Sequence, residues 1–228
     1  MKKAAQEITR IEAFSDAVFA FAATLLVVSL EVPKTFPELV TDLKGFIAFG
    51  LAFSALVLIW SVHKGFFKRY GLQDTWTVVL NSCLLFVILF YVYPLKFMSK
   101  GIALNILGVG GGQSEYRIAG FKELATLFAI YGAAFAAVFL CFSLLYLHAY
   151  RLSPALELTD CQRNEAIFLF RHYLIFAIVG LLSVLTAFSG IGLRWALPGW
   201  IYFLLGPACT LHGMLSSRRK EKPKKAAA

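Results

Sequence analysis

The sequence predicts an all-α, polytopic membrane protein with six transmembrane helices. The 228-residue chain is 59% hydrophobic and only 15% charged, whereas a soluble domain carries about 25% charged residues. Its mean hydropathy is +0.73. The charged residues are confined to short patches between long apolar runs, which is the pattern of helices that cross a bilayer.

Six apolar stretches follow one another along the chain. A helix needs about 20 residues to cross about 30 Å of hydrocarbon. The predicted spans are Ala13–Leu30, Gly45–Val62, Trp76–Phe97, Leu124–Tyr150, Ile167–Phe188 and Trp195–Leu215. The first has a polar head that contains an acid, so it is not a plain signal peptide. Pro94 is expected to bend or end the third helix because proline removes a backbone donor.

The distribution of lysine and arginine predicts the topology. Of the 22 Lys and Arg residues, 15 fall on the side that holds both termini and 7 on the other. Because cytoplasmic loops carry an excess of these residues, we expect a multi-pass protein of the cell membrane with both termini in the cytoplasm. Residues 1–217 are predicted to form one transmembrane domain, and the basic residues 218–228 a disordered tail.

Charge and cysteine content exclude two other classes of protein. The formal net charge is +9, but the basic residues form no stripe with interleaved aromatics, so no nucleic-acid partner is expected. Three of the four cysteines lie within apolar runs, and no two form a CxxC pair. We therefore expect neither a disulfide framework nor a zinc site.

The first helix carries charge at the mouth of an apolar segment. Seven residues fall on one stripe of this helix: Arg10, Phe14, Ala17, Phe21, Thr24, Leu25 and Val28. Asp16 lies about 140° from that stripe. An acid at membrane depth is costly unless it is paired, so Asp16 should face the bundle. The nearest candidate partners are His63, Lys64 and Asn81.

All four histidines lie near the inner ends of predicted spans: His63, His148, His172 and His212. This arrangement leaves open a metal site, a pH-sensing proton relay, or simple hydrogen bonding. No two histidines are spaced i,i+4, and polar groups are tolerated at the ends of spans. We therefore favour hydrogen bonding and assign no metal.

The string RxxxFSD that begins at Arg10 resembles the signature of the transmembrane protein 175 family, the lysosomal and prokaryotic potassium channels. The placing of Trp60, His63 and Asn81 and the six-helix length are similar to its prokaryotic members. The resemblance implies a homotetramer whose first helices line a central pore. It also implies a structural polar network formed by Arg10, Phe14, Ser15, Asp16, Trp60, His63 and Asn81.

The resemblance further implies which residues line the pore. In that family large apolar side chains form the constriction, and a threonine one turn beyond also lines the path. Counting from the arginine, these positions map to Phe21 and Thr24. The family's usual constriction residue is isoleucine or leucine, so phenylalanine is a departure that bears on pore radius and selectivity. The other interpretation of Phe21 is packing against lipid or another helix. The remaining predicted pore-lining residues are Ala17, Leu25 and Val28.

These features predict a passive, potassium-permeable cation channel. Its only expected small ligand is the permeant potassium ion, with no cofactor. Without rings of carbonyl groups, selectivity must come from size and dehydration at an apolar neck, so we expect it to be modest. The glycine-rich residues 107–112 have no threonine ahead of them and are interpreted as an outer loop, not a carbonyl filter.

Two alternative functions remain open from the sequence. A proton channel or a proton-coupled secondary transporter could use Asp16 and the histidines, although no inverted repeat or pair of broken helices is evident. An enzyme is not expected, because the helix centres hold only scattered Ser, Thr and Cys.

Overall fold

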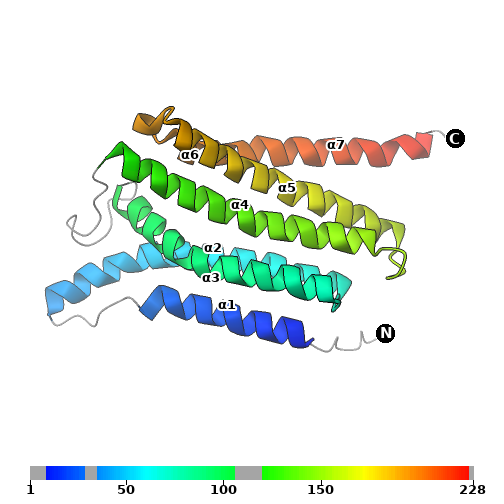
Figure 1. Ribbon diagram of the computed structural model, residues 1–228, viewed down its shortest axis with the longest axis horizontal. Coiled ribbons are helices and arrows are strands. Elements are labelled where there is room, and N and C mark those ends of the chain that lie inside the picture. Colours follow the sequence, from blue (N-terminus) through cyan, green and yellow to red (C-terminus); the bar gives the residue numbers. More distant parts are fainter. Residues whose placement is uncertain (1–8, 29–34, 106–119, 226–228) are drawn as a thin grey trace. The chain divides into compact units, whose positions relative to one another are not determined.

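The computed structural model describes residues 9–28, 35–105 and 120–225, and all regular elements in these ranges are helical (Figure 1). In chain order they are α1 (Arg10–Val28), α2 (Phe36–Tyr70), α3 (Thr75–Asn105), α4 (Phe121–Arg151), α5 (Asp160–Ser189), η1 (Leu193–Trp195), α6 (Leu197–Trp200), η2 (Ile201–Leu204) and α7 (Leu205–Lys225). The predicted all-α fold with six membrane segments is confirmed.

Among the described helices, four have the length and apolar composition of a membrane span. They are Phe46–Tyr70, Thr75–Gly101, Phe121–Arg151 and Asp160–Ser189. The first and last of the six segments are not among these four. The first contains Arg10, Glu12 and Asp16 within its opening turns, and the last is divided into η1, α6, η2 and α7.

The break at the start of the last segment has a local cause. Gly192 has a φ of 69° and Ala196 a φ of 52°, so the backbone visits the left-handed region twice within five residues. A Cβ on Gly192 would lie 2.7 Å from the Cβ of Leu197, so only glycine fits there. Pro198 then stands in the first turn of α6, where its missing N–H costs nothing.

Two other helix ends differ from the sequence prediction. The helix α3 continues for eleven residues beyond Pro94, so proline does not end it. The helix α7 runs through Lys225, whereas we predicted a disordered tail from Arg218; residues 226–228 lie outside the described part. Arg, Lys and Glu are good helix formers, and they carry the helix past the apolar segment.

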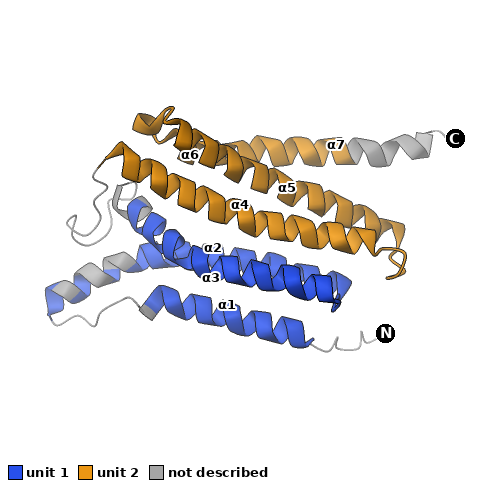
Figure 2. Cartoon of the chain, in the orientation of Figure 1, with its two compact units in different colours: residues 1–119 blue, residues 120–228 orange. Residues whose placement is uncertain are grey.

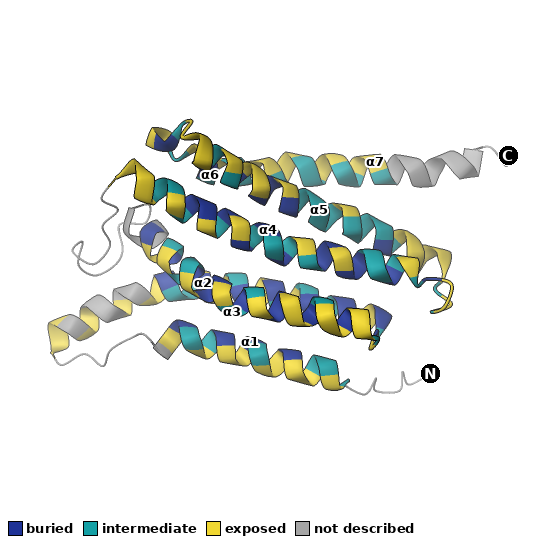
Figure 3. Ribbon diagram, in the orientation of Figure 1, coloured by how far each residue is buried: buried dark blue, intermediate teal, exposed yellow. Residues whose placement is uncertain are grey.

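The chain forms two compact units, residues 1–119 and 120–228 (Figure 2). In unit 1, α1 packs on both α2 and α3, which also pack on each other. In unit 2, α4 and α5 form the main pair, and α5 also contacts α6, η2 and α7. In Figure 3 the ribbon is coloured by burial, and both units contain buried residues interspersed with exposed ones along their helices.

The helices α4 and α5 approach each other closely at two glycines, Gly132 and Gly180. A Cβ on Gly180 would lie 3.0 Å from both the backbone N and the Cβ of Ala136. On the other helix, a Cβ on Gly132 would lie 2.9 Å from a methyl group of Val184. Small residues let membrane helices approach each other, and packing then stabilises the pair.

We expect Gly180→Ala to destabilise unit 2 by about 1–3 kcal/mol, because the added methyl meets backbone that cannot move alone. A thermal unfolding scan of the purified protein measures the effect. The matched control is Gly50→Ala in α2, where a Cβ would meet nothing within 4 Å. Equal melting temperatures for the two variants would contradict the close approach.

Candidate functional site

The register of α1 is fixed at its first residue by a capping box. The Thr9 backbone N–H and hydroxyl both donate to Glu12 Oε2, at 3.0 and 2.8 Å. In return the Glu12 backbone N–H donates to Thr9 Oγ1 at 3.2 Å. This reciprocal pair satisfies donors at the helix start and so stabilises the first turn of α1.

One hydrogen-bonded chain joins the three helices of unit 1. Asn81 on α3 donates from Nδ2 to Ser15 Oγ on α1 at 2.9 Å, and Ser15 Oγ donates to Ile11 O at 2.8 Å. His63 Nε2 on α2 lies 2.8 Å from Asn81 Oδ1. An amide oxygen can only accept, so His63 Nε2 carries the proton in this arrangement. These hydrogen bonds thereby select the tautomer of His63 that is protonated at Nε2, and they hold α1, α2 and α3 in one arrangement.

This chain is dry. Ser15, His63 and Asn81 are 0%, 1% and 3% exposed. The His63 ring is packed by Phe19 of α1, with ring centroids 5.4 Å apart, and by Phe67 of α2, at 4.8 Å. A buried polar group that loses its partner costs about 1–3 kcal/mol, so each member of the chain depends on the others.

A second, more exposed contact joins α1 to α2. Trp60 Nε1 donates to Asp16 Oδ1 at 2.7 Å, and the Lys64 ammonium lies 4.9 Å from the centre of the Trp60 ring. Asp16 is therefore paired, but its partner is the indole of Trp60 rather than His63, Lys64 or Asn81. The carboxylate lies at an exposed position of unit 1 and outside the buried chain.

The seven residues of the predicted polar network thus divide into three groups. Ser15, His63 and Asn81 share the buried chain, while Asp16 and Trp60 form the exposed pair. The other two, Arg10 and Phe14, lie at exposed positions of α1. Within the described part of the chain, the Arg10 guanidinium has no hydrogen-bond or ion-pair partner.

The opposite face of α1 is uncovered by unit 1. The side of α1 that packs on α2 and α3 is buried and consists of Ser15, Phe19, Ala22 and Leu26. Phe14 and Phe21 are 62% and 56% exposed, although both carry large apolar rings. An exposed apolar surface of this kind indicates contact with lipid or with another chain.

Three of the residues predicted to line the pore lie at exposed positions of α1: Ala17, Phe21 and Thr24. Leu25 is half-buried, while the side chain of Val28 lies outside the described residues. The Thr24 hydroxyl donates to Phe21 O at 2.7 Å within the same helix. That bond leaves the oxygen lone pairs of Thr24 available on the outer surface.

The four histidines divide between the two units. His63 belongs to unit 1, whereas His148, His172 and His212 belong to unit 2. The His172 and His212 rings have centroids 6.1 Å apart. Among the described residues there is no group of three or more His, Cys, Asp or Glu side chains that could hold a metal ion.

Comparison with known proteins identifies the family. Residues 10–91 match the sequence profile of the endosomal/lysosomal potassium channel TMEM175. This range contains both the buried hydrogen-bonded chain and the uncovered face of α1. The chain is 37% identical over 222 residues to a potassium channel of Marivirga tractuosa, covering 94% of this chain and 90% of that relative. The chain belongs to the TMEM175 family. The resemblance inferred from the RxxxFSD string is therefore confirmed.

Structure and a second relative agree with membership of the TMEM175 family. A crystal structure of the potassium channel MtTMEM175, a threonine-to-alanine variant bound to a nanobody fusion protein, is similar with a TM-score of 0.84 and 36% identity. The similarity covers 93% of this chain and 95% of that one. A potassium channel of Chamaesiphon minutus is 26% identical over 87% of this chain and 94% of its own length. This TMEM175 family member is a multi-pass membrane protein of a channel family.

Sequence reasoning missed one residue that supports the candidate pore helix of this TMEM175 family member. The Lys96 ammonium on α3 donates to Leu26 O in the last turn of α1 at 2.8 Å. The last carbonyls of a helix have no partner within it, and a cation is favoured there. In the sequence Lys96 counted only as a loop charge. Its position within an apolar run, two residues after Pro94, was the available signal.

We expect Lys96→Met to loosen the last turn of α1 and to speed amide exchange there by about tenfold, which corresponds to about 1.4 kcal/mol of lost local stability. Hydrogen-exchange mass spectrometry of peptides that cover residues 22–28 measures this. Lys100→Met, one turn further along α3 at an exposed position, is the matched control. The inferred contact is contradicted if both variants exchange like the unmodified protein.

Proposed function

We propose that the protein is a passive, potassium-permeable cation channel in which the uncovered face of α1 lines the conduction path. The observation that carries this proposal is the division of α1 into two faces. One face holds the buried chain through Ser15, and the other leaves Phe21 56% exposed. The relatives that are named potassium channels support the same function.

The assembly that suits this proposal is a homotetramer. Unit 1 uses one side of α1 to pack on α2 and α3, which leaves the other side of α1 for the proposed pore. One helix cannot enclose a path, and several copies around an axis can. A closed ring of identical subunits is the usual solution for such an assembly. The channel is proposed to lie in the cell membrane with both termini in the cytoplasm.

The constriction is proposed to be a ring of Phe21 side chains. An apolar neck excludes water and ions unless it widens, so the same ring can act as filter and gate. Ala17 lies one turn before Phe21 and Thr24 one turn after it, with Leu25 and Val28 beyond. Conduction of this kind is passive, so it involves no chemical reaction and no cofactor.

Ion flux into liposomes tests the proposal. Purified protein is reconstituted with potassium chloride inside, and uptake of a tracer cation is driven by the potassium gradient. We expect a potassium-driven flux that is larger than the flux with sodium and absent with N-methylglucamine. Empty liposomes provide the control.

The same vesicles test the proton alternative. The membrane potential is set with a potassium gradient, and internal pH is followed with a trapped dye. We expect little acidification unless a protonophore is added, because His63 is held in a buried hydrogen-bonded chain. Rapid acidification without a protonophore, seen only when valinomycin carries the compensating potassium efflux, would replace the potassium channel by a proton channel. Proton-driven uphill transport would indicate a transporter.

A further inference from the structure

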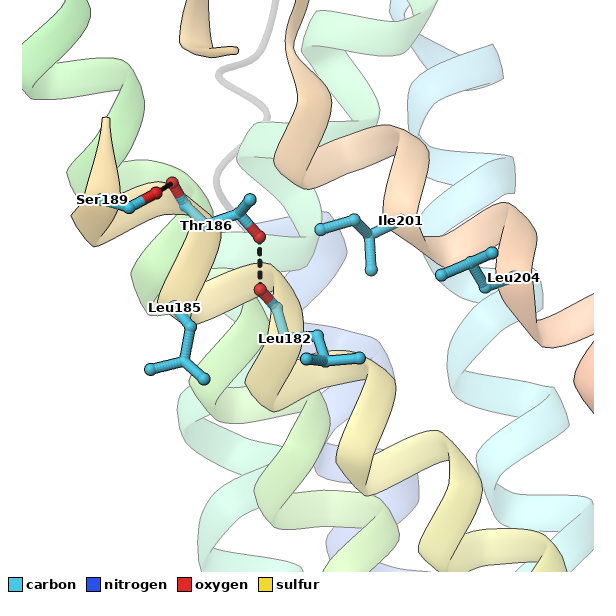
Figure 4. A pocket seen from close by; sticks show the side chains of 6 residues that line it. All are labelled: Leu182, Leu185, Thr186, Ser189, Ile201 and Leu204. Carbon is cyan, nitrogen blue, oxygen red and sulfur yellow. Dashed lines mark hydrogen bonds between the residues drawn. The ribbon is translucent and has the colours of Figure 1, made fainter. Parts of the chain in front are cut away.

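A groove opens at the end of α5 in unit 2, formed by residues other than those of the candidate pore helix. It has a volume of about 360 Å³. Its walls are the last turns of α5 and the short helix η2 (Figure 4). The lining residues are Leu182, Leu185, Thr186, Ser189, Ile201 and Leu204.

The surface of the groove is almost entirely apolar. The Thr186 hydroxyl donates to Leu182 O, and the Ser189 hydroxyl donates to Thr186 O at 2.9 Å and accepts from the Ile191 N–H at 3.3 Å. Both hydroxyl hydrogens are thus committed to the backbone of α5 (Figure 4). An occupant with polar groups of its own would leave them unpaired here, so an apolar occupant is favoured.

The walls of the groove are held in place. Ser183 is buried on α5 and donates from Oγ to Pro198 O in α6 at 2.9 Å. This bond ties α5 to the segment that leads into η2. Leu182, Leu185 and Leu204 nevertheless remain 43%, 64% and 50% exposed, so the groove is open along its length.

The chain reversal beside the groove fixes its depth in the membrane. The segment 190–196 connects α5, which is a candidate span, with the helices that return through the bilayer. A connection between two spans lies at the membrane surface. Trp195 and Trp200 are 75% and 60% exposed, as expected of aromatic residues at an interface. We therefore expect the groove to lie just below the headgroup level.

One cation lies on this connection. Arg194 is exposed, and its guanidinium has no partner among the described residues. It belongs to the segment that joins the two walls of the groove, between Ser189 and Ile201. A guanidinium at headgroup level binds phosphate oxygens well because its donors match their geometry.

We propose that this groove is a binding site for one phospholipid, with an acyl chain between α5 and η2 and the phosphate on Arg194. Small-molecule sites range over about 300–1,000 Å³, so the groove accommodates part of one chain and leaves the rest of the lipid in the bilayer. An anionic headgroup suits the single positive charge best. The site is independent of the proposed ion conduction.

Native mass spectrometry of delipidated protein titrated with phosphatidylglycerol tests the site. We expect one bound lipid per chain in the unmodified protein. Thr186→Phe, which fills the groove, should weaken that binding at least tenfold, and Leu185→Phe provides a second filling variant. Arg194→Gln should weaken phosphatidylglycerol binding and remove the preference over phosphatidylcholine.

The matched control is Thr126→Phe. Thr126 lies on α4, is exposed, and donates to a carbonyl four residues earlier, as Thr186 does, but it lines no part of the groove. It should bind lipid like the unmodified protein. Equal lipid binding by Thr126→Phe and both filling variants would overturn the proposal. A second result would also overturn it: the unmodified protein binds no lipid, and the filling variants change the number of subunits. The groove would then be a contact between copies of the chain.

Discussion

Replacing Phe21 by alanine is expected to raise cation flux by about tenfold or more and to weaken the preference for potassium. The phenyl ring is 56% exposed on the face of α1 that unit 1 leaves uncovered. If four such rings form the neck, removing them widens it, and a barrier lowered by about 1.4 kcal/mol corresponds to a tenfold faster rate. Flux into liposomes with potassium and with sodium measures both changes.

Two comparisons make the Phe21 result specific. Phe86→Ala on α3 removes a ring that is 73% exposed but belongs to another helix, and it should leave flux unchanged. Thr24→Val keeps the size of the side chain and removes only a hydroxyl, so it should change conduction less than Phe21→Ala. If flux and selectivity are the same in Phe21→Ala and Phe86→Ala, Phe21 faces lipid or a neighbouring helix.

Replacing Asn81 by leucine is expected to cause the largest loss of stability. Asn81 is 3% exposed and bonds both His63 and Ser15, so the change removes the link between three helices. The His63 N–H then has no partner in an apolar site, which costs about 1–3 kcal/mol in addition to the two lost hydrogen bonds. The melting temperature and the yield of assembled protein measure the loss.

The exposed Asn164 of α5 provides the control for this change. Asn164→Leu makes the same substitution at an exposed position and should alter the melting temperature by far less. His63→Ala in the Asn81→Leu background should cost less than in the unmodified protein, because the shared bond is already absent. If the losses of stability in the His63 and Asn81 variants were fully additive, their hydrogen bonds would not be coupled.

Much of the fold follows from the sequence because a bilayer imposes simple rules. Long apolar runs such as Trp76–Phe97 must be helical, since lipid offers no partner to the backbone. The helical period also separates Phe21 from Ser15 without any knowledge of neighbouring helices. In the structure Ser15 is buried and Phe21 is exposed, whereas Asp16, which we predicted to face the bundle, is exposed.

The partner of Asp16 could not be predicted in the same way. A helical period gives the direction of a side chain but not how far one helix is displaced along its neighbour. The displacement of α2 brings Trp60 to Asp16, and His63, nearly one turn further on, meets Asn81 instead. Lys96 was missed for the same reason, since its contact with Leu26 depends on how α3 lies against α1.

The last membrane segment was predicted as one helix, but it is broken near its start. Hydropathy averages over about 20 residues and does not register backbone conformation at single positions. Gly192 and Ala196 adopt left-handed conformations, and a Cβ on Gly192 would clash with Leu197. The glycine and proline residues of this region were the signal for a break.

The central claim, that the stripe of α1 that carries Phe21 and Thr24 lines the path of the ion, is tested most directly by cysteine accessibility during conduction. In a functional background without Cys83, Cys141, Cys161 and Cys209, single cysteines are introduced at Thr24 and at Val27. Val27 is also exposed, at 42%, but lies off the predicted stripe. We predict that a water-soluble cationic thiol reagent blocks the potassium current of Thr24→Cys and leaves that of Val27→Cys intact. Block of Val27→Cys alone, or of neither variant while both conduct potassium, would contradict the claim.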